Sequence, residues 1–357
     1  MKLAHWLSVG VMLSGFACGF APANASDITL QLRQRPFGFS SPDRQQAADS
    51  TAETAQTQSG NFKSGNVSSG DSSRAILTWR SAAEQYRLLN DLEGQQRAYR
   101  SLSQLYAQQQ RPVEAEHAFR QTLRFARARR DFSALVQDYN HVGTVLLSRS
   151  SATEAEKSFS EGLRIAADLG DRAGQGLGWT NLGLAAQRMG QDQIAIERLK
   201  TGIAFYQSTS DVAGEAIAST YLGDSYRNLG DAQQSAGAHL NALMLARSSG
   251  SIGTQDRAMA GLASAYDRSG STDSARNVLD QRLTLAMSGT NTLARVSAFR
   301  AMAEFSQRQG DLAATDRYYQ NAIAVASSSG LMVEAREMSQ KLENLRRGYH
   351  LSPRRNG

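Results

Sequence analysis

Cysteine, proline and lysine are scarce in this sequence. One cysteine, Cys18, and five prolines occur among its 357 residues. A chain that loses Cys18 with a leader peptide has no disulfide and no cysteine-based metal site, which suits an oxidising compartment. Pro112 is the only proline between residues 72 and 347, and it falls at a first-turn position that proline tolerates, so long stretches are free to be helical. Nearly all positive charge is arginine, because lysine occurs only at positions 2, 63, 157, 200 and 341.

Motifs of the common catalytic centres are also missing. The sequence has no HExxH, G-x-S-x-G, P-loop or CxxC. The glycines of Gly174–Gly178 resemble a phosphate loop, but no strand is predicted before them, so helix packing is the better explanation. The histidines beyond residue 25 share no spacing: His117, His141, His239 and His350. The sequence therefore predicts a protein that is not an enzyme and that uses neither a cofactor nor a metal.

Residues 1–25 have the pattern of a secretory signal peptide. A basic start precedes an apolar stretch at residues 6–20, and an A-x-A cleavage site ends at Ala25. The apolar stretch is too short and too rich in glycine for a convincing transmembrane helix. We therefore expect an exported protein, periplasmic or secreted, that is cleaved after Ala25. Two alternatives stay open: an uncleaved N-terminal membrane anchor, and a lipoprotein modified at Cys18.

Residues 26–72 are predicted to be a disordered, low-complexity linker. From residue 40 to 73 the chain is mostly serine, glutamine, alanine, threonine, glycine and asparagine. Such a segment buries too little apolar surface to offset the entropy lost on ordering, so no helix is expected at 50–69. The alternation of Ile28, Leu30 and Leu32 leaves one alternative, a short strand that adds to the sheet edge of a partner.

Glycine recurs at an interval of forty residues in the rest of the chain. One position is held by Gly70, Gly190, Gly230, Gly270 and Gly310, and a second by Gly170, Gly250 and Gly330. A fixed period of roughly 20–50 residues is typical of a repeat array. Glycine suits the left-handed residue that ends a helix, and the aspartates that follow these positions can cap the next helix.

Each repeat contains columns of equivalent residues. The first helix has an apolar column, followed at once by a small residue: Leu102, Val142, Leu182, Leu222, Leu262 and Met302, then Ser103, Gly143, Gly183, Gly223, Ala263 and Ala303. The second helix has a large, mostly aromatic column: Trp79, Phe119, Phe159, Leu199, His239, Leu279 and Tyr319. Because glycine inside a helix costs about 1 kcal/mol relative to alanine, the small column predicts close approach of a neighbouring helix. His239 is interpreted as a packed core residue rather than a ligand.

These columns resemble the tetratricopeptide repeat (TPR). The matching residues are Trp179, Leu182-Gly183, Ala195 and Leu199 in one repeat, Leu222-Gly223, Tyr226 and Ala242 in the next, and Tyr106, Ala115 and Phe119 earlier. The resemblance covers about 72–347. The period of forty exceeds the family's usual length of about 34, as in the variants of kinesin light chain and bacterial peptide receptors, and the family's proline near the end of the second helix is missing.

The resemblance implies an all-α fold, a right-handed α-α superhelix of about 14 helices. We expect the solenoid at 73–347, with a lone helix at about 74–89, six helix pairs, and a capping helix at about 331–347. In that last helix Glu343 and Arg346 stand where a further repeat would need small and aromatic residues, so the array ends there. A basic tail is expected at 348–357.

By resemblance, the function belongs to the concave groove formed by the first helices. The expected binding residues are Arg97, Arg100, Gln104, Asn140, Asn181, Arg188 and Arg227. Arginine binds carboxylates through its planar fork, so we expect a protein or peptide partner with an acidic or C-terminal segment, and no nucleic acid. The family's Lys/Asn carboxylate clamp is matched only in part.

Three alternatives to this non-catalytic scaffold stay open. The first is a ligand- or peptide-sensing regulatory protein, the second is an enzyme whose site has no recognisable motif, and the third is that the groove residues are merely solvated. Arg124, Arg127, Arg129 and Arg130 form a basic cluster at a helix C-terminus, where cations complement the helix dipole. Contact of this cluster or the basic tail with an anionic membrane or polymer is the alternative.

Overall fold

The computed structural model describes residues 41–60 and 69–351, and all fifteen regular elements in this part of the chain are helices. By compactness the chain divides into residues 1–44 and 45–357. Of the first unit only residues 41–44, at the start of a helix, are described, and the second unit contains the rest of the helices. The predicted signal peptide and the alternation at 28–32 lie outside the described residues.

The helices of the solenoid alternate between two kinds, which we call first and second helices. The first helices are α2 (Ser41–Gly60), α4 (Leu92–Gln108), α6 (Phe132–Ser148), α8 (Arg172–Arg188), α10 (Val212–Asn228), α12 (Ile252–Arg268), α14 (Thr292–Arg308) and α16 (Met332–Leu351). The second helices are α3 (Ser69–Leu88), α5 (Pro112–Arg129), α7 (Ala152–Asp168), α9 (Asp192–Thr209), α11 (Ala232–Ser248), α13 (Thr272–Ser288) and α15 (Leu312–Ser328). From α4 onward, successive first helices begin forty residues apart.

Helix ends follow the expected chemistry. Six aspartates accept a hydrogen bond from the backbone N–H three residues later, at 2.9–3.0 Å, which caps the following helix. They are Asp91, Asp131, Asp171, Asp211, Asp231 and Asp311. From Gly170 onward the repeating glycines adopt the left-handed conformation, with φ from 66° at Gly170 to 82° at Gly230, whereas Gly70 lies inside helix α3 and ends no helix. Arg130 and Ser210 adopt it without being glycine, with φ of 55° and 57°, because the same turn recurs in most repeats; the turn after α13 differs, and its Gly289 is extended.

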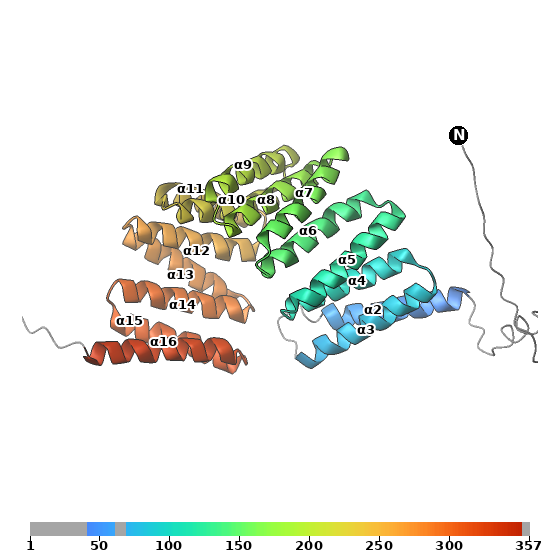
Figure 1. Cartoon of the computed structure of the whole chain (residues 1–357). Coiled ribbons are helices and arrows are strands. Elements are labelled where there is room, and N and C mark those ends of the chain that lie inside the picture. Colours follow the sequence, from blue (N-terminus) through green and yellow to red (C-terminus); the bar gives the residue numbers. More distant parts are fainter. Residues whose placement is uncertain (1–40, 61–68, 352–357) are drawn as a thin grey trace, which may run out of the picture. The chain divides into compact units, whose positions relative to one another are not determined.

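Neighbouring helices in sequence are also neighbours in space (Figure 1). Every consecutive pair from α3 to α16 is in contact. Helices two apart touch at α6–α8, α8–α10 and α10–α12, and all of these are first helices. The first helices therefore form the more closely packed layer, and the second helices form the other layer. This is the arrangement expected of a TPR-like solenoid.

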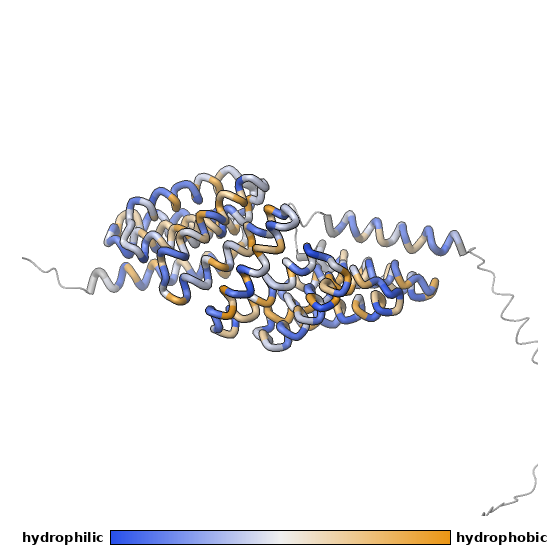
Figure 2. Tube along the Cα trace, turned by 90° about the horizontal axis from the view of Figure 1, so that it is seen from above, coloured by the Kyte–Doolittle hydropathy of each residue, from blue (hydrophilic) through white to orange (hydrophobic). Residues whose placement is uncertain are grey.

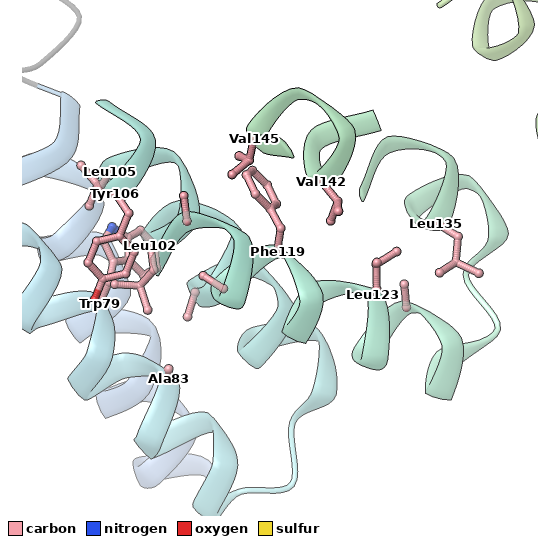
Figure 3. Close-up of a cluster of buried hydrophobic side chains, with 14 of the residues drawn as sticks. Trp79, Ala83, Leu102, Leu105, Tyr106, Phe119, Leu123, Leu135, Val142 and Val145 are labelled. Carbon is pink, nitrogen blue, oxygen red and sulfur yellow. The ribbon is translucent and has the colours of Figure 1, made fainter. Parts of the chain in front are cut away.

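The core follows the sequence columns. Each helix carries an apolar stripe that alternates with polar residues (Figure 2). Close to Gly183, an added Cβ would lie 2.6 Å from the Leu199 side chain, and at Gly143 it would meet the Phe159 ring. The small column therefore makes room for the large column of the paired helix, as predicted. Figure 3 shows the core one repeat earlier, where Phe119 extends toward Val145 of the following first helix.

One column residue is less buried than predicted. Leu182, Leu262 and Met302 are at most 5 % exposed, whereas Leu222 is only partly buried against the small cluster around Leu199. His239 is fully buried, so its interpretation as a packed core residue is confirmed.

The prediction of a linker at 26–72 is wrong over 41–60 and 69–72, where the chain is helical. The predicted lone helix also has a partner. Helix α2 spans Ser41–Gly60, and Ala48 and Ala55 are fully buried in the same core cluster as Trp79 and Tyr86. The Tyr86 hydroxyl donates a hydrogen bond of 2.6 Å to Asp49. Alanine buries little area of its own, but it lets two helices approach closely, and a scan for large apolar residues misses this. The structure thus has seven helix pairs before α16.

The C-terminal end is close to the prediction. Helix α16 continues to Leu351, so the first four residues of the predicted basic tail are helical. Glu343 and Arg346 are exposed, which agrees with the expectation that this helix ends the array.

Candidate binding face of the first helices

Two of the expected binding residues line a pocket between α2, α3 and α4. Arg97 and Arg100 form part of its wall, Trp79 and Tyr86 supply aromatic surface, and the volume is about 470 Å³. Helix α2 adds Asp49 and Glu53 to the same pocket. Arg97 lies 3.5 Å from Asp49, and both side chains are at least half exposed. An exposed pair of this kind is worth little, so Arg97 can exchange Asp49 for another carboxylate.

Arg100 has a structural partner instead. Its guanidinium donates a hydrogen bond of 2.9 Å to Asp138, whose side chain is fully buried. Gln96 donates to the other carboxylate oxygen at 3.2 Å. Removing one partner of a buried ion pair leaves an uncompensated charge, which is strongly destabilising. The expectation that Arg100 serves a ligand carboxylate therefore conflicts with its role in holding Asp138.

Asn140 and Asn181 are joined to each other. The Asn181 amide donates to Asn140 at 2.7 Å, and the Asn140 amide donates to the carbonyl of Val136 at 2.8 Å. Asn140 is buried, while Asn181 is half-buried. Asn140 thus positions Asn181 and offers little surface to a ligand.

Gln104 and Arg188 are exposed, as Arg97 is. Neither has a side-chain partner among the described residues. Arg227 is half-buried and pairs with Asp224 at 2.8 Å. The structure therefore does not gather the seven predicted residues at one point, since they extend along α4, α6, α8 and α10.

A charged cluster that the sequence did not predict lies between α10 and α12. Asp224 accepts a hydrogen bond from Arg257 at 2.8 Å and forms an ion pair with Arg227, also at 2.8 Å. The Arg257 guanidinium lies 4.2 Å from the centre of the Tyr221 ring. The Asp224 side chain is 12 % exposed and that of Arg257 is 48 % exposed. Two guanidiniums share one carboxylate, so the cluster is net positive and Arg257 keeps free N–H donors.

His239 completes the floor of this cluster. Its ring is packed against Gly223 and Gly261, and neither ring nitrogen has a hydrogen-bond partner among the described residues. Nε2 lies 3.7 Å from Asp224, which is beyond a hydrogen bond. Burial lowers the pKa of His239 to about 4, although the Asp224 charge opposes the shift. The imidazole is therefore neutral at pH 7.

Similar side-chain bridges join every neighbouring pair of first helices. In chain order they are Arg97–Asp49, Arg100–Asp138, Asn181–Asn140, Gln187–Ser225, Arg257–Asp224, Arg308–Asp267 and Lys341–Glu304. Much of the polar surface that the sequence assigned to ligand binding thus holds adjacent repeats together. Opposite charges spaced about one repeat apart in the sequence, such as Asp224 and Arg257, could have predicted these bridges.

The described residues contain no group of three or more histidine, cysteine, aspartate or glutamate side chains that could hold a metal ion. None of the described helices is both long enough and apolar enough to span a membrane. What this face offers chemically is a set of arginine donors bordered by aromatic rings.

Comparison with known proteins gives matches only among solved structures. No protein-family model and no curated protein matches the sequence. A signal transduction ATPase with a tetratricopeptide repeat sensor from Pyrococcus horikoshii has a TM-score of 0.59 at 16 % identity over 84 % of this chain. This chain spans 46 % of that protein's length.

Two further structures match along most of both chains. The apo form of RapI has a TM-score of 0.55 at 14 % identity, covering 75 % of this chain and 92 % of that one. A Rap protein complexed with Competence and Sporulation Factor has a TM-score of 0.53 at 12 % identity, covering 85 % and 93 %. At these identities the likeness concerns the fold alone, and by that likeness the chain has a TPR-like fold.

Proposed function

We propose that this chain is a non-catalytic scaffold that binds a protein or peptide partner on its layer of first helices and works outside the cytoplasm. The observation that carries the proposal is a set of three arginines on that layer with exposed side chains. Arg97, Arg188 and Arg257 are at least partly exposed, and none of them neutralises a buried carboxylate alone. Their free donors favour a partner with acidic side chains or a C-terminal carboxylate.

Partner binding also agrees with what similar folds do. The Rap structure holds Competence and Sporulation Factor, and another solenoid with a TM-score of 0.50, Cut9, forms a hetero-tetramer with Hcn1. Export remains part of the proposal through the pattern of residues 1–25, whose cleavage would place the solenoid in the periplasm or outside the cell.

The experiment starts with a pull-down from the envelope fraction, using the chain that begins at Ser26. A recovered partner is then titrated against wild type and against Arg97→Ala combined with Arg188→Ala. These two arginines are chosen because neither pairs with a buried carboxylate. Arg100→Ala, by contrast, would leave the buried charge of Asp138 without its ion-pair partner. We expect affinity to fall at least about tenfold at low salt, and the salt dependence to weaken, because the attraction is electrostatic.

The matched control is Arg276→Ala combined with Arg317→Ala, which removes the same charge from exposed positions on the second helices α13 and α15. It should bind as wild type does. Equal binding by wild type and the Arg97/Arg188 variant would contradict the role of the first helices.

A second candidate is a peptide-sensing protein, and the pocket at Arg97 favours it. Asp49 and Glu53 of α2 stand where an acidic ligand would bind, so such a ligand competes with α2. Binding would then weaken the contact of α2 with α4. Hydrogen exchange distinguishes the candidates: a sensor loses protection in α2 when the partner is added, and a rigid scaffold does not.

A further inference from the structure

Helix α5 carries an unusual density of positive charge for this molecule. With its flanking residues it contains six arginines and two carboxylates, Glu114 and Glu116. The next second helix, α7, has four carboxylates against Lys157 and Arg164. The charge of α5 is therefore a local feature and not a property of every second helix.

Part of this charge forms one exposed stripe. His117, Arg120, Arg124 and Arg127 follow one another at spacings of three and four, which places them on one side of the helix, and all four are exposed. The opposite side, with Phe119 and Leu123, is buried (Figure 3). Arg130 continues the stripe at the C-terminal cap. We call Arg120, Arg124, Arg127 and Arg130 the α5 ridge.

The nearby carboxylates do not neutralise the ridge. Glu116 is shared between Arg120 and Arg149. Glu114 pairs with Arg111 at 2.7 Å. Within the described part of the chain, Arg124, Arg127 and Arg130 form no ion pair. Arg124 donates to Gln121 and Arg127 donates to the hydroxyl of Tyr139, both neutral groups.

A pocket with an aromatic floor lies on each side of the ridge. The first lies between α3, α4 and α5, has a volume of about 550 Å³, and is lined by Tyr99, Leu102, Val113 and His117. The second lies between α5, α6 and α7, with about 460 Å³. Its lining includes Phe132, Leu135, Tyr139 and Leu169. Tyr99 and Tyr139 hold the same position in consecutive repeats, but the other lining residues of the two pockets are not equivalent, because the pockets lie at different ends of their helices.

The outer parts of both pockets expose apolar side chains. Val113 is 59 % exposed at the first pocket, and Phe132 and Leu169 are 50 % and 46 % exposed at the second. The first pocket meets α5 near Val113–Ala118 and the second meets it at Arg127. A rise of 1.5 Å per residue separates these points by about 15 Å along the helix.

We infer that the α5 ridge and its two pockets form a second docking surface, for an acidic segment of a partner protein that carries two large apolar side chains. The carboxylates face the unpaired arginines, and each apolar side chain enters one pocket. A separation of about 15 Å corresponds to roughly ten residues of helix or five of extended chain. This surface belongs to the second-helix layer and does not use the residues of the proposed function.

The direct test uses a defined probe. A fluorescent helical peptide with glutamates in the middle and phenylalanines ten residues apart is titrated into the chain from Ser26 onward, by anisotropy at low salt. The matched peptide has serine in place of both phenylalanines. We expect the serine peptide to bind at least about tenfold more weakly, because it leaves the pockets empty.

The protein variant removes the charge without disturbing the core. Arg124→Gln combined with Arg127→Gln should weaken the phenylalanine peptide at least about tenfold, while Arg317→Gln combined with Arg336→Gln should not. Thermal melting checks that both variants are folded. If the ridge variant has lost stability, hydrogen-exchange mapping of the wild-type complex replaces it, and protection must appear in α3, α5 and α7.

Three outcomes would overturn the inference. Equal binding of both peptides would mean that charge alone is recognised. Vesicles containing an anionic phospholipid that bind the chain through Arg124 and Arg127, with no binding of the phenylalanine peptide, would identify a membrane surface instead. Loss of peptide binding in the Arg97/Arg188 variant with an unaffected ridge variant would place the peptide on the first helices, which leaves the proposed function standing and removes this one.

Discussion

At the scale of single residues, burial decides what each polar group can do. Asp138 and His239 are both fully buried, but the first is held by Arg100 and Gln96, while the second has no hydrogen-bond partner among the described residues. Arg188, by contrast, is exposed and unpaired within the described chain. Polar residues of the repeats therefore fall into two groups. Some are buried and structural, and others are exposed and available to a partner.

The His239 pKa predicts a specific loss of stability in acid. The folded-state pKa is about 4, below the usual value of 6.5, because burial disfavours the charged ring. The unfolded chain binds a proton that the folded chain does not, so stability falls as the pH drops from about 6.5 to 4 and the loss is complete below that. The full effect is on the order of 3 kcal/mol. Denaturant unfolding between pH 7 and 4 measures it.

The matched variants for that measurement are His239→Leu and His117→Gln. Leucine occupies the same column at Leu199, so His239→Leu should keep the fold and flatten the acid dependence relative to wild type. His117 is exposed, and its substitution should change nothing. An unchanged acid dependence in His239→Leu would show that other groups cause the loss.

Two leucines of one column should respond differently to truncation. Leu182 is 5 % exposed and Leu222 is only partly buried. We expect Leu182→Ala to cost about 2–5 kcal/mol of unfolding free energy, and Leu222→Ala clearly less, because the cost depends on the cavity left behind. Urea unfolding of both variants provides the measurement. Equal losses would mean that Leu222 is more deeply packed than the structure indicates.

At the scale of the helices, α2 is the element that differs most from the prediction made from the sequence. It supplies Ala48 and Ala55 to the core, accepts a hydrogen bond from Tyr86 through Asp49, and faces Arg97. An element without a single large apolar residue thus completes the first helix pair. It does so because small side chains allow close packing, and because its polar groups match those of α3 and α4.

Removing α2 should therefore expose α3. In a chain that starts at Ser69, amides of α3 should exchange at least about tenfold faster than in the chain from Ser26, because Trp79 and Tyr86 lose their cover. Repeats from α8 onward should keep their protection, since solenoid repeats are coupled mainly to their neighbours. A chain that starts at Ser41 is the control and should match the longer form. Unchanged exchange in α3 would show that α2 does not stabilise the array.

At the scale of the whole molecule, seven side-chain bridges connect the first helices in series, and the three arginines proposed to bind a partner, Arg97, Arg188 and Arg257, lie among them. Each bridge is shared by two repeats, so these polar groups link neighbouring repeats. The second-helix layer has its own positive region at α5. The two proposed partner surfaces therefore lie on different layers and differ in chemistry.

Export makes a prediction about the mature chain. We expect the protein recovered from cells to begin at Ser26, because the A-x-A pattern ends at Ala25 and signal peptidases cleave after such a site. N-terminal sequencing or intact mass measures this. A chain that keeps Met1, or a lipid on Cys18, would contradict it and support the anchored or lipoprotein alternative.

Periodicity in the sequence was enough for the repeat, the helix ends and most of the core. The reason is local, since the aspartate caps, the left-handed turns and the small column opposite the large column, as at Gly183 and Leu199, act within one repeat. Helix α2 was not predicted because its burial depends on the side chains of α3 and α4 that pack against it, and not on its own apolar content. The expectation that the array ends at α16 came from Glu343, which stands where the small column needs glycine or alanine.

Only the tertiary structure decided which polar side chains are left without a partner inside the protein. The sequence placed Arg97, Arg100 and Arg188 on one face and could not distinguish them. Packing set Arg100 beside the buried Asp138, placed Arg97 beside an exposed carboxylate, and left Arg188 without a partner among the described residues. Pairing across repeats depends on distances between helices about forty residues apart in the chain. A single repeat does not contain that information, and it is this pairing that determines where a partner can bind.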